Sequence, residues 1–254
     1  MSIFGMMGMC IKKAWRNKQV SQNYLYEYIL SPCVTTVTFC LMNKNQDIMI
    51  ILAGVSVMIL WSVNIFECAY MVFDEKVNGT LGNILLSPFY TQFILFSEAL
   101  GSVIFNIPII LVVFGATYWI HPYTLEWKVM LWFMAAYFLF MISIAVISVL
   151  LAAVLLYTRS ARGIMNVIGY PFFILSGLLV PVEKLPVCIR WISGWIPSSH
   201  AFDIFRIALT GKTEELLKSV GRCLGAILFL SLLTGMILAY TRRQALVKGT
   251  IDVY

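Results

Sequence analysis

The sequence contains little charge. Of its 254 residues, 12% are Asp, Glu, Lys or Arg, whereas a soluble domain carries roughly 25%. Apolar residues make up 61% of the chain and lie in long stretches without charge. Most of these stretches approach or exceed the ~20 residues with which a helix crosses the bilayer core. The shortage of charge therefore excludes a soluble globular domain and predicts an all-α, polytopic membrane protein.

The sequence also lacks the motifs of metal sites and enzymes. It has two histidines, and its six cysteines form no C-x-x-C pair, so neither a zinc site nor a disulfide framework is expected. We interpret the cysteines as small packing residues, with a Cys188–Cys223 bridge as the alternative. Neither H-E-x-x-H nor G-x-S-x-G occurs, and no histidine falls inside a predicted span to act as a general base. An intramembrane enzyme is therefore the weaker hypothesis.

A nucleotide-binding motif is missing as well. The nearest match is the triplet Gly211-Lys212-Thr213, but Arg206 stands where a P-loop has its first glycine. We therefore expect no catalytic, cofactor-binding or metal-binding residue on this chain.

Breaker residues and charges divide the apolar sequence into six predicted spans within a single transmembrane domain over residues 1–254. The spans lie near residues 24–43, 49–73, 92–120, 129–157, 163–181 and 221–241. Basic residues flank the first and last spans, as the positive-inside rule describes for cytoplasmic segments. The net charge of +6 is therefore not a sign of nucleic-acid binding. An even number of spans with two basic ends predicts a cell-membrane protein with both termini in the cytoplasm.

The N-terminal segment differs from a signal peptide. Its apolar residues precede its first charges at Lys12 and Lys13, whereas a signal peptide has the opposite order. Apolar residues at near-helical spacing predict an interfacial helix over residues 1–20, lying on membrane lipid.

A polar segment, FDEKVNGTLGNILLSP at residues 73–88, separates the second and third predicted spans. Three charged residues precede the turn signal Asn78-Gly79, and leucines at helical spacing follow it. The pattern predicts a short cytoplasmic helix within residues 74–90. Its leucines would need cover from the membrane surface or from a protein partner.

A second unusual segment follows the fifth predicted span. Residues 182–218 alternate aromatic and aliphatic side chains with charged ones, and Pro186 and Pro197 interrupt them. The segment is too polar to span the membrane and too apolar for a free loop. We predict paired re-entrant half-helices at the outer face, covered by protein, with a plain outer cap as the alternative.

Charged residues in or beside the spans allow two interpretations. Glu27, Glu67 and Glu98 either pair with basic residues of the N-terminal helix (Lys12, Lys13 or Arg16) or line a substrate entrance. In the outer segment, three residues are spaced by one helical turn. They either stabilise a re-entrant helix internally or form an outer gate: His200, Asp203 and Arg206.

Two motifs resemble the membrane subunits of type-2 ABC transporters. The stretch D-E-K-x-x-G-T-L-x-x-x-L-L-S-P from Asp74 to Pro88 is similar to that family's E-x-x-x-G-T-x-E-x-L-x-x-x-P coupling segment, although Gly82 replaces a common acidic residue. The second motif resembles S-G-x-x-x-P-x-x-x-L-P followed by P-x-x-H-x-x-x-x-x-R. Its matching positions are Ser176, Gly177, Pro181, Leu185, Pro186, Pro197, His200 and Arg206.

The resemblance implies a permease without its own ATPase. Two copies of a separate ATPase subunit would bind ATP and Mg²⁺, and a second permease copy or a non-identical sister would complete the transporter. A cleft in the ATPase would receive the coupling segment, burying its leucines with its charged residues at the rim. The implied coupling residues are Asp74, Glu75, Lys76, Gly79, Thr80, Leu81, Leu85, Leu86 and Pro88.

The expected activity is export of an amphiphile such as a drug, an antimicrobial peptide, a lipid or a lipid-linked glycan. Besides an intramembrane enzyme, the alternative is a membrane immunity or sensor protein that binds a ligand without transporting it.

Overall fold

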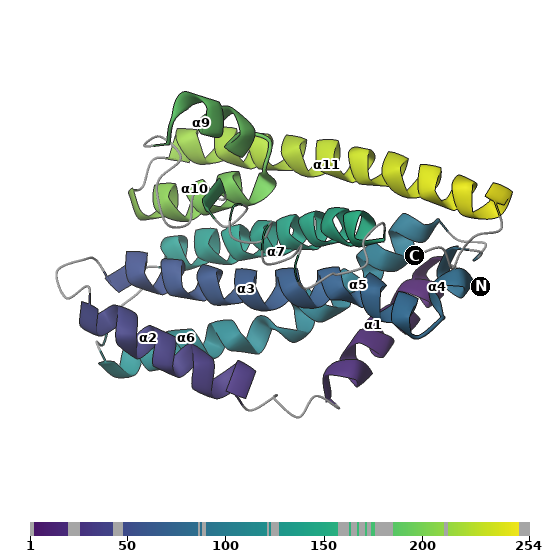
Figure 1. Cartoon of the computed structure of the whole chain (residues 1–254). Coiled ribbons are helices and arrows are strands. Elements are labelled where there is room, and N and C mark those ends of the chain that lie inside the picture. Colours follow the sequence, from purple (N-terminus) through teal and green to yellow (C-terminus); the bar gives the residue numbers. More distant parts are fainter. Residues whose placement is uncertain are drawn as a thin grey trace.

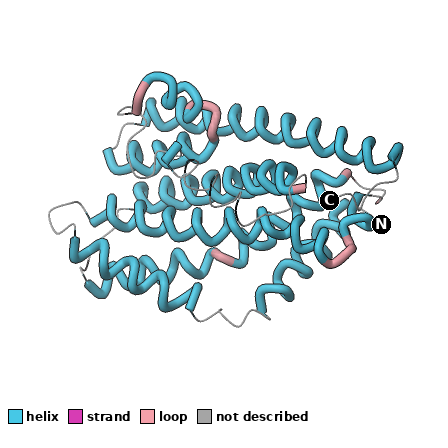
Figure 2. The backbone as a smooth tube through the Cα atoms, in the orientation of Figure 1, coloured by secondary structure: helices cyan, strands magenta, loops and turns pink. Residues whose placement is uncertain are grey.

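The computed structural model describes residues 3–19, 26–42, 48–85, 87, 90–120, 122, 127–156, 163, 167, 171, 174–175, 185–210 and 213–248. The described part is almost entirely helical and contains no strand (Figure 2). Its elements are α1 (Ile3–Gln19), the π-helical turn η1 (Tyr26–Leu30), α2 (Ser31–Met42), α3 (Ile48–Val77), α4 (Leu81–Leu85), α5 (Thr91–Phe105), α6 (Ile107–Ile120), α7 (Trp127–Leu155), α9 (Val187–Ser193), α10 (Pro197–Thr210) and α11 (Thr213–Lys248). The all-α prediction is confirmed for these residues.

Among the described residues, four helices are long and apolar enough to cross a membrane: Leu52–Val77, Thr91–Ile120, Val129–Leu155 and Glu215–Gln244. They correspond to the second, third, fourth and sixth predicted spans. A shorter apolar helix, Tyr28–Leu41, lies within the first predicted span. The fifth, 163–181, falls largely outside the described residues, so the count of six stays a prediction.

The third predicted span is bent rather than straight. Pro108 has no N–H to donate to Ile104 one turn earlier, so the helical ladder is interrupted there. The Asn106 N–H donates to the carbonyls of Ser102 (3.2 Å) and Val103 (3.1 Å), and α6 then begins at Ile107. The kink places the buried Asn106 side chain in the middle of the span.

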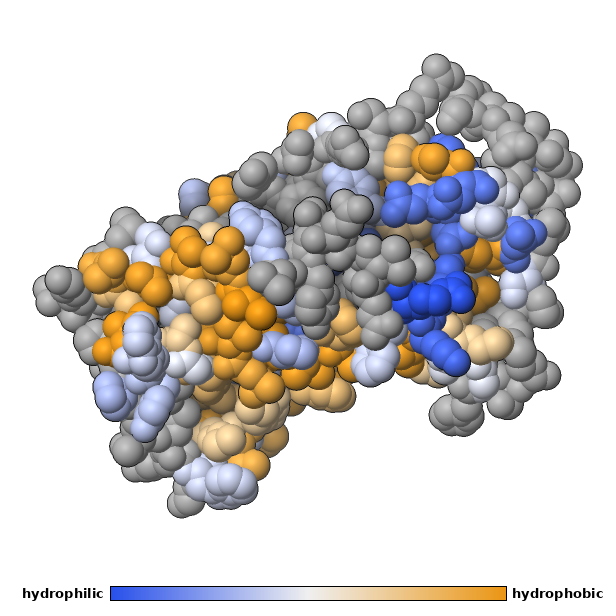
Figure 3. All heavy atoms as spheres, turned by 90° about the horizontal axis from the view of Figure 1, so that it is seen from below, coloured by the Kyte–Doolittle hydropathy of each residue, from blue (hydrophilic) through white to orange (hydrophobic). Residues whose placement is uncertain are grey.

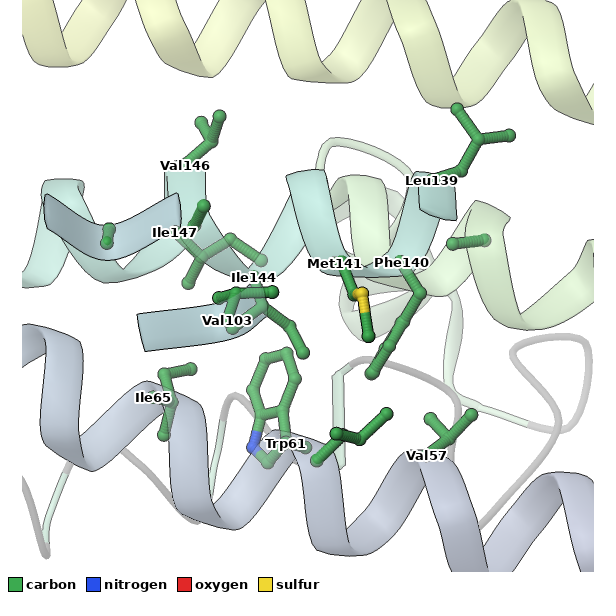
Figure 4. Close-up of a cluster of buried hydrophobic side chains, with 14 of the residues drawn as sticks. Val57, Trp61, Ile65, Val103, Leu139, Phe140, Met141, Ile144, Val146 and Ile147 are labelled. Atoms are coloured by element: carbon green, nitrogen blue, oxygen red, sulfur yellow. The ribbon is translucent and has the colours of Figure 1, made fainter. Parts of the chain in front are cut away.

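The core lies around α7, which packs against α3, α5, α10 and α11. In Figure 4, Trp61 reaches from α3 toward Ile144 of α7 and Val103 of α5. The Trp61 and Phe140 rings are 6.5 Å apart and both are buried. Alanines on α7, including Ala145 and Ala152, are also fully buried. Such small side chains let neighbouring helices approach closely.

The bundle has two chemically different ends. At one end, which we call the α1 end, lie α1, α4, the start of α5 and the end of α11 (Figure 1). Arg242 near the end of α11 donates to the Ser87 carbonyl, 2.9 Å away, just after α4. Figure 3 shows hydrophobic surface over much of the length and hydrophilic side chains gathered toward the α1 end.

The opposite end, the α9 end, carries the segment predicted to be re-entrant. It contains α9 and α10, and α10 packs against α7 and α11. The Phe205 ring of α10 lies 4.6 Å from the Tyr137 ring of α7. Residues 213–218 belong to α11 instead, because that helix begins at Thr213 and not at the predicted 221. Entry of α9 and α10 into the membrane stays a prediction.

Candidate functional site

The predicted coupling segment begins on α3. Asp74, Glu75 and Lys76 form the last turn of this helix rather than the start of a new one. The Thr80 N–H donates to the Glu75 carbonyl (2.9 Å), and the Gly79 N–H donates to the Lys76 carbonyl (3.2 Å). These two bonds are a Schellman motif, which needs a left-handed residue after the helix. Gly79 supplies it with φ +69°.

The short helix α4 follows this turn and packs against α3 and α5. Leu81 and Leu85 are only 7% and 3% exposed. The prediction that these two leucines need cover from a partner is therefore wrong: the chain's own helices bury them. The side chains of Leu86 and Pro88 lie outside the described residues.

What the segment exposes is its turn. Asp74, Asn78, Gly79, Thr80 and Asn83 are exposed. Val77 is 69% exposed although it is apolar. We call residues 77–80 together with Asn83 the exposed turn.

A lysine of α1 connects this segment to the bundle. The Lys13 ammonium contacts the Glu75 carboxylate and lies 2.6 Å from Oε1 of Glu98 on α5. The two carboxylate side chains are only 14% and 3% exposed. Burial opposes the charged form of Lys13, but its hydrogen bonds to the two carboxylates outweigh this and raise its pKa above the ordinary value. The cluster therefore holds α1, α3 and α5 together.

The charged residues of the segment mostly bond within the chain. Glu75 also accepts a hydrogen bond from the Thr80 hydroxyl. The Lys76 ammonium donates to the carbonyl of Leu156, just after α7, at 3.1 Å. Of the three charged residues predicted to face a partner, Asp74 alone is exposed.

A second polar cluster surrounds the kink between α5 and α6. Asn106 Nδ2 donates to Asn64 Oδ1 (2.7 Å) and lies 3.4 Å from Oε2 of Glu67, and Tyr28 donates its O–H to Asn106 Oδ1. Asn64 and Asn106 are fully buried and Tyr28 is 4% exposed. Lipid offers no hydrogen bonds, so polar groups at membrane depth must satisfy one another. The cluster joins η1, α3 and the kinked span.

The three glutamates thus have different surroundings. Glu98 pairs with Lys13, as one of the two interpretations of the sequence expects. Glu67 lies beside Asn106 and belongs to the second cluster. The side chain of Glu27 lies outside the described residues. A role for these glutamates in a substrate entrance stays a prediction.

Two members of the polar cluster at the kink, Asn64 and Asn106, were not predicted from the sequence. Asn64 and Asn106 each lie inside a predicted span. A polar amide inside an apolar span could have indicated the cluster, because the amide needs a hydrogen-bond partner within the bundle. Pro108 likewise indicated the kink that brings Asn106 to Asn64.

At the α9 end, the predicted gate residues bond within their own segment. His200 donates from Nε2 to the Gly194 carbonyl at 2.9 Å. Nη1 of Arg206 lies 3.9 Å from Oδ1 of Asp203, and the Arg206 guanidinium lies 4.5 Å from the centre of the Phe202 ring. This agrees with internal stabilisation of the segment. A role as an outer gate stays a prediction.

The two cysteines considered for a bridge are not joined in the structure. Cys188 is exposed and Cys223 is buried, and both are free thiols. The Cys223 thiol donates to the Pro197 carbonyl at 3.4 Å. Within the described ranges, no group of three or more His, Cys, Asp or Glu is placed to hold a metal ion.

Long apolar helices, with polar side chains that bond to one another within the bundle, define a multi-pass helical membrane protein. The family model for ABC-2 type transporters matches residues 2–210, from the start of α1 to the end of α10, and the chain belongs to this family. The resemblance drawn from the two motifs is thereby confirmed, and the protein is a permease subunit of a type-2 ABC transporter. No curated protein matches the chain. Permeases of this family normally work with an ABC ATPase partner.

Proposed function

We propose that this permease exports an amphiphilic substrate across the cell membrane, driven by ATP hydrolysis on a separate ATPase. Two ATPase copies and a second permease, identical or a sister chain, would complete the transporter. Both termini and the α1 end would lie in the cytoplasm. The basic residues at this end, including Lys12, Arg16, Arg242 and Arg243, support that orientation.

The exposed turn is the proposed docking point for the ATPase. One observation carries this proposal: Val77, the last residue of α3, has an apolar side chain that is 69% exposed at the start of the exposed turn, although the nearby Leu81 and Leu85 are buried. An exposed apolar residue at the centre of a small polar surface is typical of an interface, in which polar groups form the rim. Asp74, Asn78 and Asn83 would form that rim.

The packing around the turn suits it to transmit force. Leu81 and Leu85 anchor α4 against α3 and α5, and Lys13 joins α1 to the same two helices. A push on the turn would therefore move the ends of α3 and α5 as one unit. These two helices also carry Asn64, Glu67 and Asn106. ATP binding would thus displace the polar cluster at the kink and shift the bundle from inward-open to outward-open.

Val77→Asp tests the docking. The substituted side chain stays in water in the isolated permease, so folding and membrane insertion are expected to be unchanged. In the complex it would place a charge in a desolvated contact. We expect co-purification of the co-expressed ATPase to fall by at least tenfold.

Val187→Asp is the matched control, because Val187 is 77% exposed on α9 at the opposite end. It should leave the complex intact. Equal ATPase recovery with both variants would show that the exposed turn is not the docking point.

Export itself needs a separate measurement. Inside-out vesicles containing the permease and its ATPase should accumulate an amphiphilic dye when ATP is added outside. An ATPase mutant unable to hydrolyse ATP should abolish this accumulation. If the permease with the inactive ATPase still protected cells from a toxic ligand, although the vesicles accumulated no dye, the non-transporting sensor or immunity function would be favoured.

A further inference from the structure

A small pocket lies at the α1 end between the first turn of α5 and the last turns of α11. Its volume is about 210 Å³, and Thr91, Gln92, Gly235, Leu238, Arg242 and Arg243 are among its lining residues. Pockets for whole drug-sized molecules measure roughly 300–1,000 Å³. This pocket therefore fits one chemical group better than a whole amphiphile.

Thr91 is the unusual member of this lining. Its side chain is 4% exposed, and its hydroxyl has no hydrogen-bond partner among the described residues. Buried hydroxyls are nearly always paired, because an unpaired one loses its bonds to water without replacement. A bound acceptor in the pocket would complete the hydroxyl's hydrogen bonding.

The start of α5 adds further donors. Tyr90 occupies the N-cap position and provides no side-chain cap. The first N–H groups of a helix have no partner within it, and together with the helix dipole they favour a negative group. The pocket thus combines an unpaired hydroxyl, a helix N-terminus and the guanidinium groups of Arg242 and Arg243. None of the described residues that line it carries a carboxylate.

Contacts between α5 and α11 fix the shape of the pocket. Gln92 donates from Nε2 to the Ser231 carbonyl (2.7 Å) and lies 3.1 Å from the Ser231 hydroxyl. A Cβ on Gly235 would lie 2.4 Å from Gln92 Oε1, so a larger residue there would displace the Gln92 side chain. Arg242 is held by its bond to the Ser87 carbonyl. The pocket is therefore built before any ligand binds.

We infer that this pocket binds the phosphate of an anionic phospholipid headgroup. Its position favours a lipid over a soluble phosphate, because the span Thr91–Ile120 starts here and the span Glu215–Gln244 ends here. Headgroups lie at this boundary, and basic residues there attract anionic lipids. Phe93 on α5 and Met236 on α11 are 51% and 65% exposed and offer apolar surface for acyl chains.

Lipid titration of the purified full chain in detergent tests the inference. Native mass spectrometry would count bound phosphatidylglycerol, with phosphatidylcholine as the neutral lipid and inorganic phosphate as the soluble anion. We expect tight binding of phosphatidylglycerol alone. Thr91→Val and Arg243→Gln should each weaken it by roughly tenfold, because each removes a charge-assisted contact to the phosphate.

Two matched variants separate the site from general effects. Thr234→Val removes a buried hydroxyl that already donates to the Leu230 carbonyl, and Arg222→Gln removes an exposed arginine from the other end of α11. Both should bind phosphatidylglycerol normally. Without lipid, Thr91→Val should be at least as heat-stable as the wild type, because it loses no hydrogen bond.

The inference fails if Thr91→Val binds phosphatidylglycerol as well as the wild type does, or if phosphatidylcholine binds equally well. Inorganic phosphate that binds the wild type but not Thr91→Val, without any preference for phosphatidylglycerol, would overturn the lipid assignment. That result would leave a site for a soluble anion.

Discussion

Removal of the Lys13 ammonium is the sharpest test of how the α1 end is held together. In Lys13→Met, the carboxylates of Glu75 and Glu98 lose their shared cation, although both are largely buried. Removing one partner of a buried ion pair costs about 3–5 kcal/mol. The Lys13 side chain is 37% exposed, so solvent screening places the expected loss near the lower end, at about 3 kcal/mol.

This loss is large enough to measure. One kcal/mol shifts Tm by about 2–4 °C in a domain of this size, so Lys13→Met should lower Tm by roughly 6–12 °C. Tryptophan fluorescence during heating is a suitable assay, because the Trp15 ring of α1 packs edge-on against Phe105 of α5 at 5.6 Å. Trp15 is one of seven tryptophans, so its part of the signal, identified by comparison with a Trp15→Phe variant, reports the release of α1 from the bundle.

The pH dependence follows from the sign of the pKa shift. The pKa of Lys13 is raised above its ordinary 10.5. Its contribution is therefore fully present at neutral pH and is lost only as the pH rises through the higher, folded-state pKa. The Lys13 charge should thus stabilise the wild type equally across the neutral range.

Two comparisons make the test specific. Lys12→Met removes the exposed neighbouring lysine and should leave Tm nearly unchanged. Lys13→Met combined with Glu98→Gln should recover part of the loss, because the amide carries no charge to leave unpaired. Equal Tm values for Lys12→Met and Lys13→Met would show that the Lys13 ammonium does not hold α1 to the bundle, as would a double variant less stable than Lys13→Met alone.

Two further predictions concern the turn and the kink. Gly79→Ala should lower stability by about 1–2 kcal/mol, because its φ of +69° is unfavourable for a residue with a Cβ. A Cβ there would meet no atom within 4 Å. Gly79→Asn should therefore cost less than Gly79→Ala in a denaturation assay, because asparagine adopts the left-handed conformation more readily. Asn106→Ala should cost about 1–3 kcal/mol, because it leaves Tyr28 and Asn64 without their shared partner. A double-mutant cycle with Asn64→Ala should show coupling of at least ~0.5 kcal/mol, and additive losses would contradict the cluster.

The sequence predicts the long apolar helices well because burial in lipid depends on composition over many residues. The span near 129–157 needs no tertiary information, and α7 occupies almost the same residues. Helix ends beyond the membrane carry no such signal. The charges at Asp74 to Lys76 end the apolar stretch without ending α3, and α11 begins eight residues before its predicted span.

The candidate site is predictable in position but not in packing. The motif from Asp74 to Pro88 indicates the family, which the family model confirms, and Gly79 marks the turn after α3. A local pattern cannot decide which surface covers an apolar face. Leu81 and Leu85 have the spacing of an exposed amphipathic helix, yet α3 and α5 bury them. Whether Lys13 reaches Glu98 likewise depends on where α1 packs.

The exposed turn is the proposed contact with the ATPase, and site-specific cross-linking measures that contact most directly. A photo-reactive amino acid at Asn78 or Asn83 should form a covalent adduct with the co-expressed ATPase, and its yield should change when ATP binds. The same probe at Val187 should form none. Absence of adducts from both turn positions, with the complex intact, or equal adducts from Val187, would contradict the account.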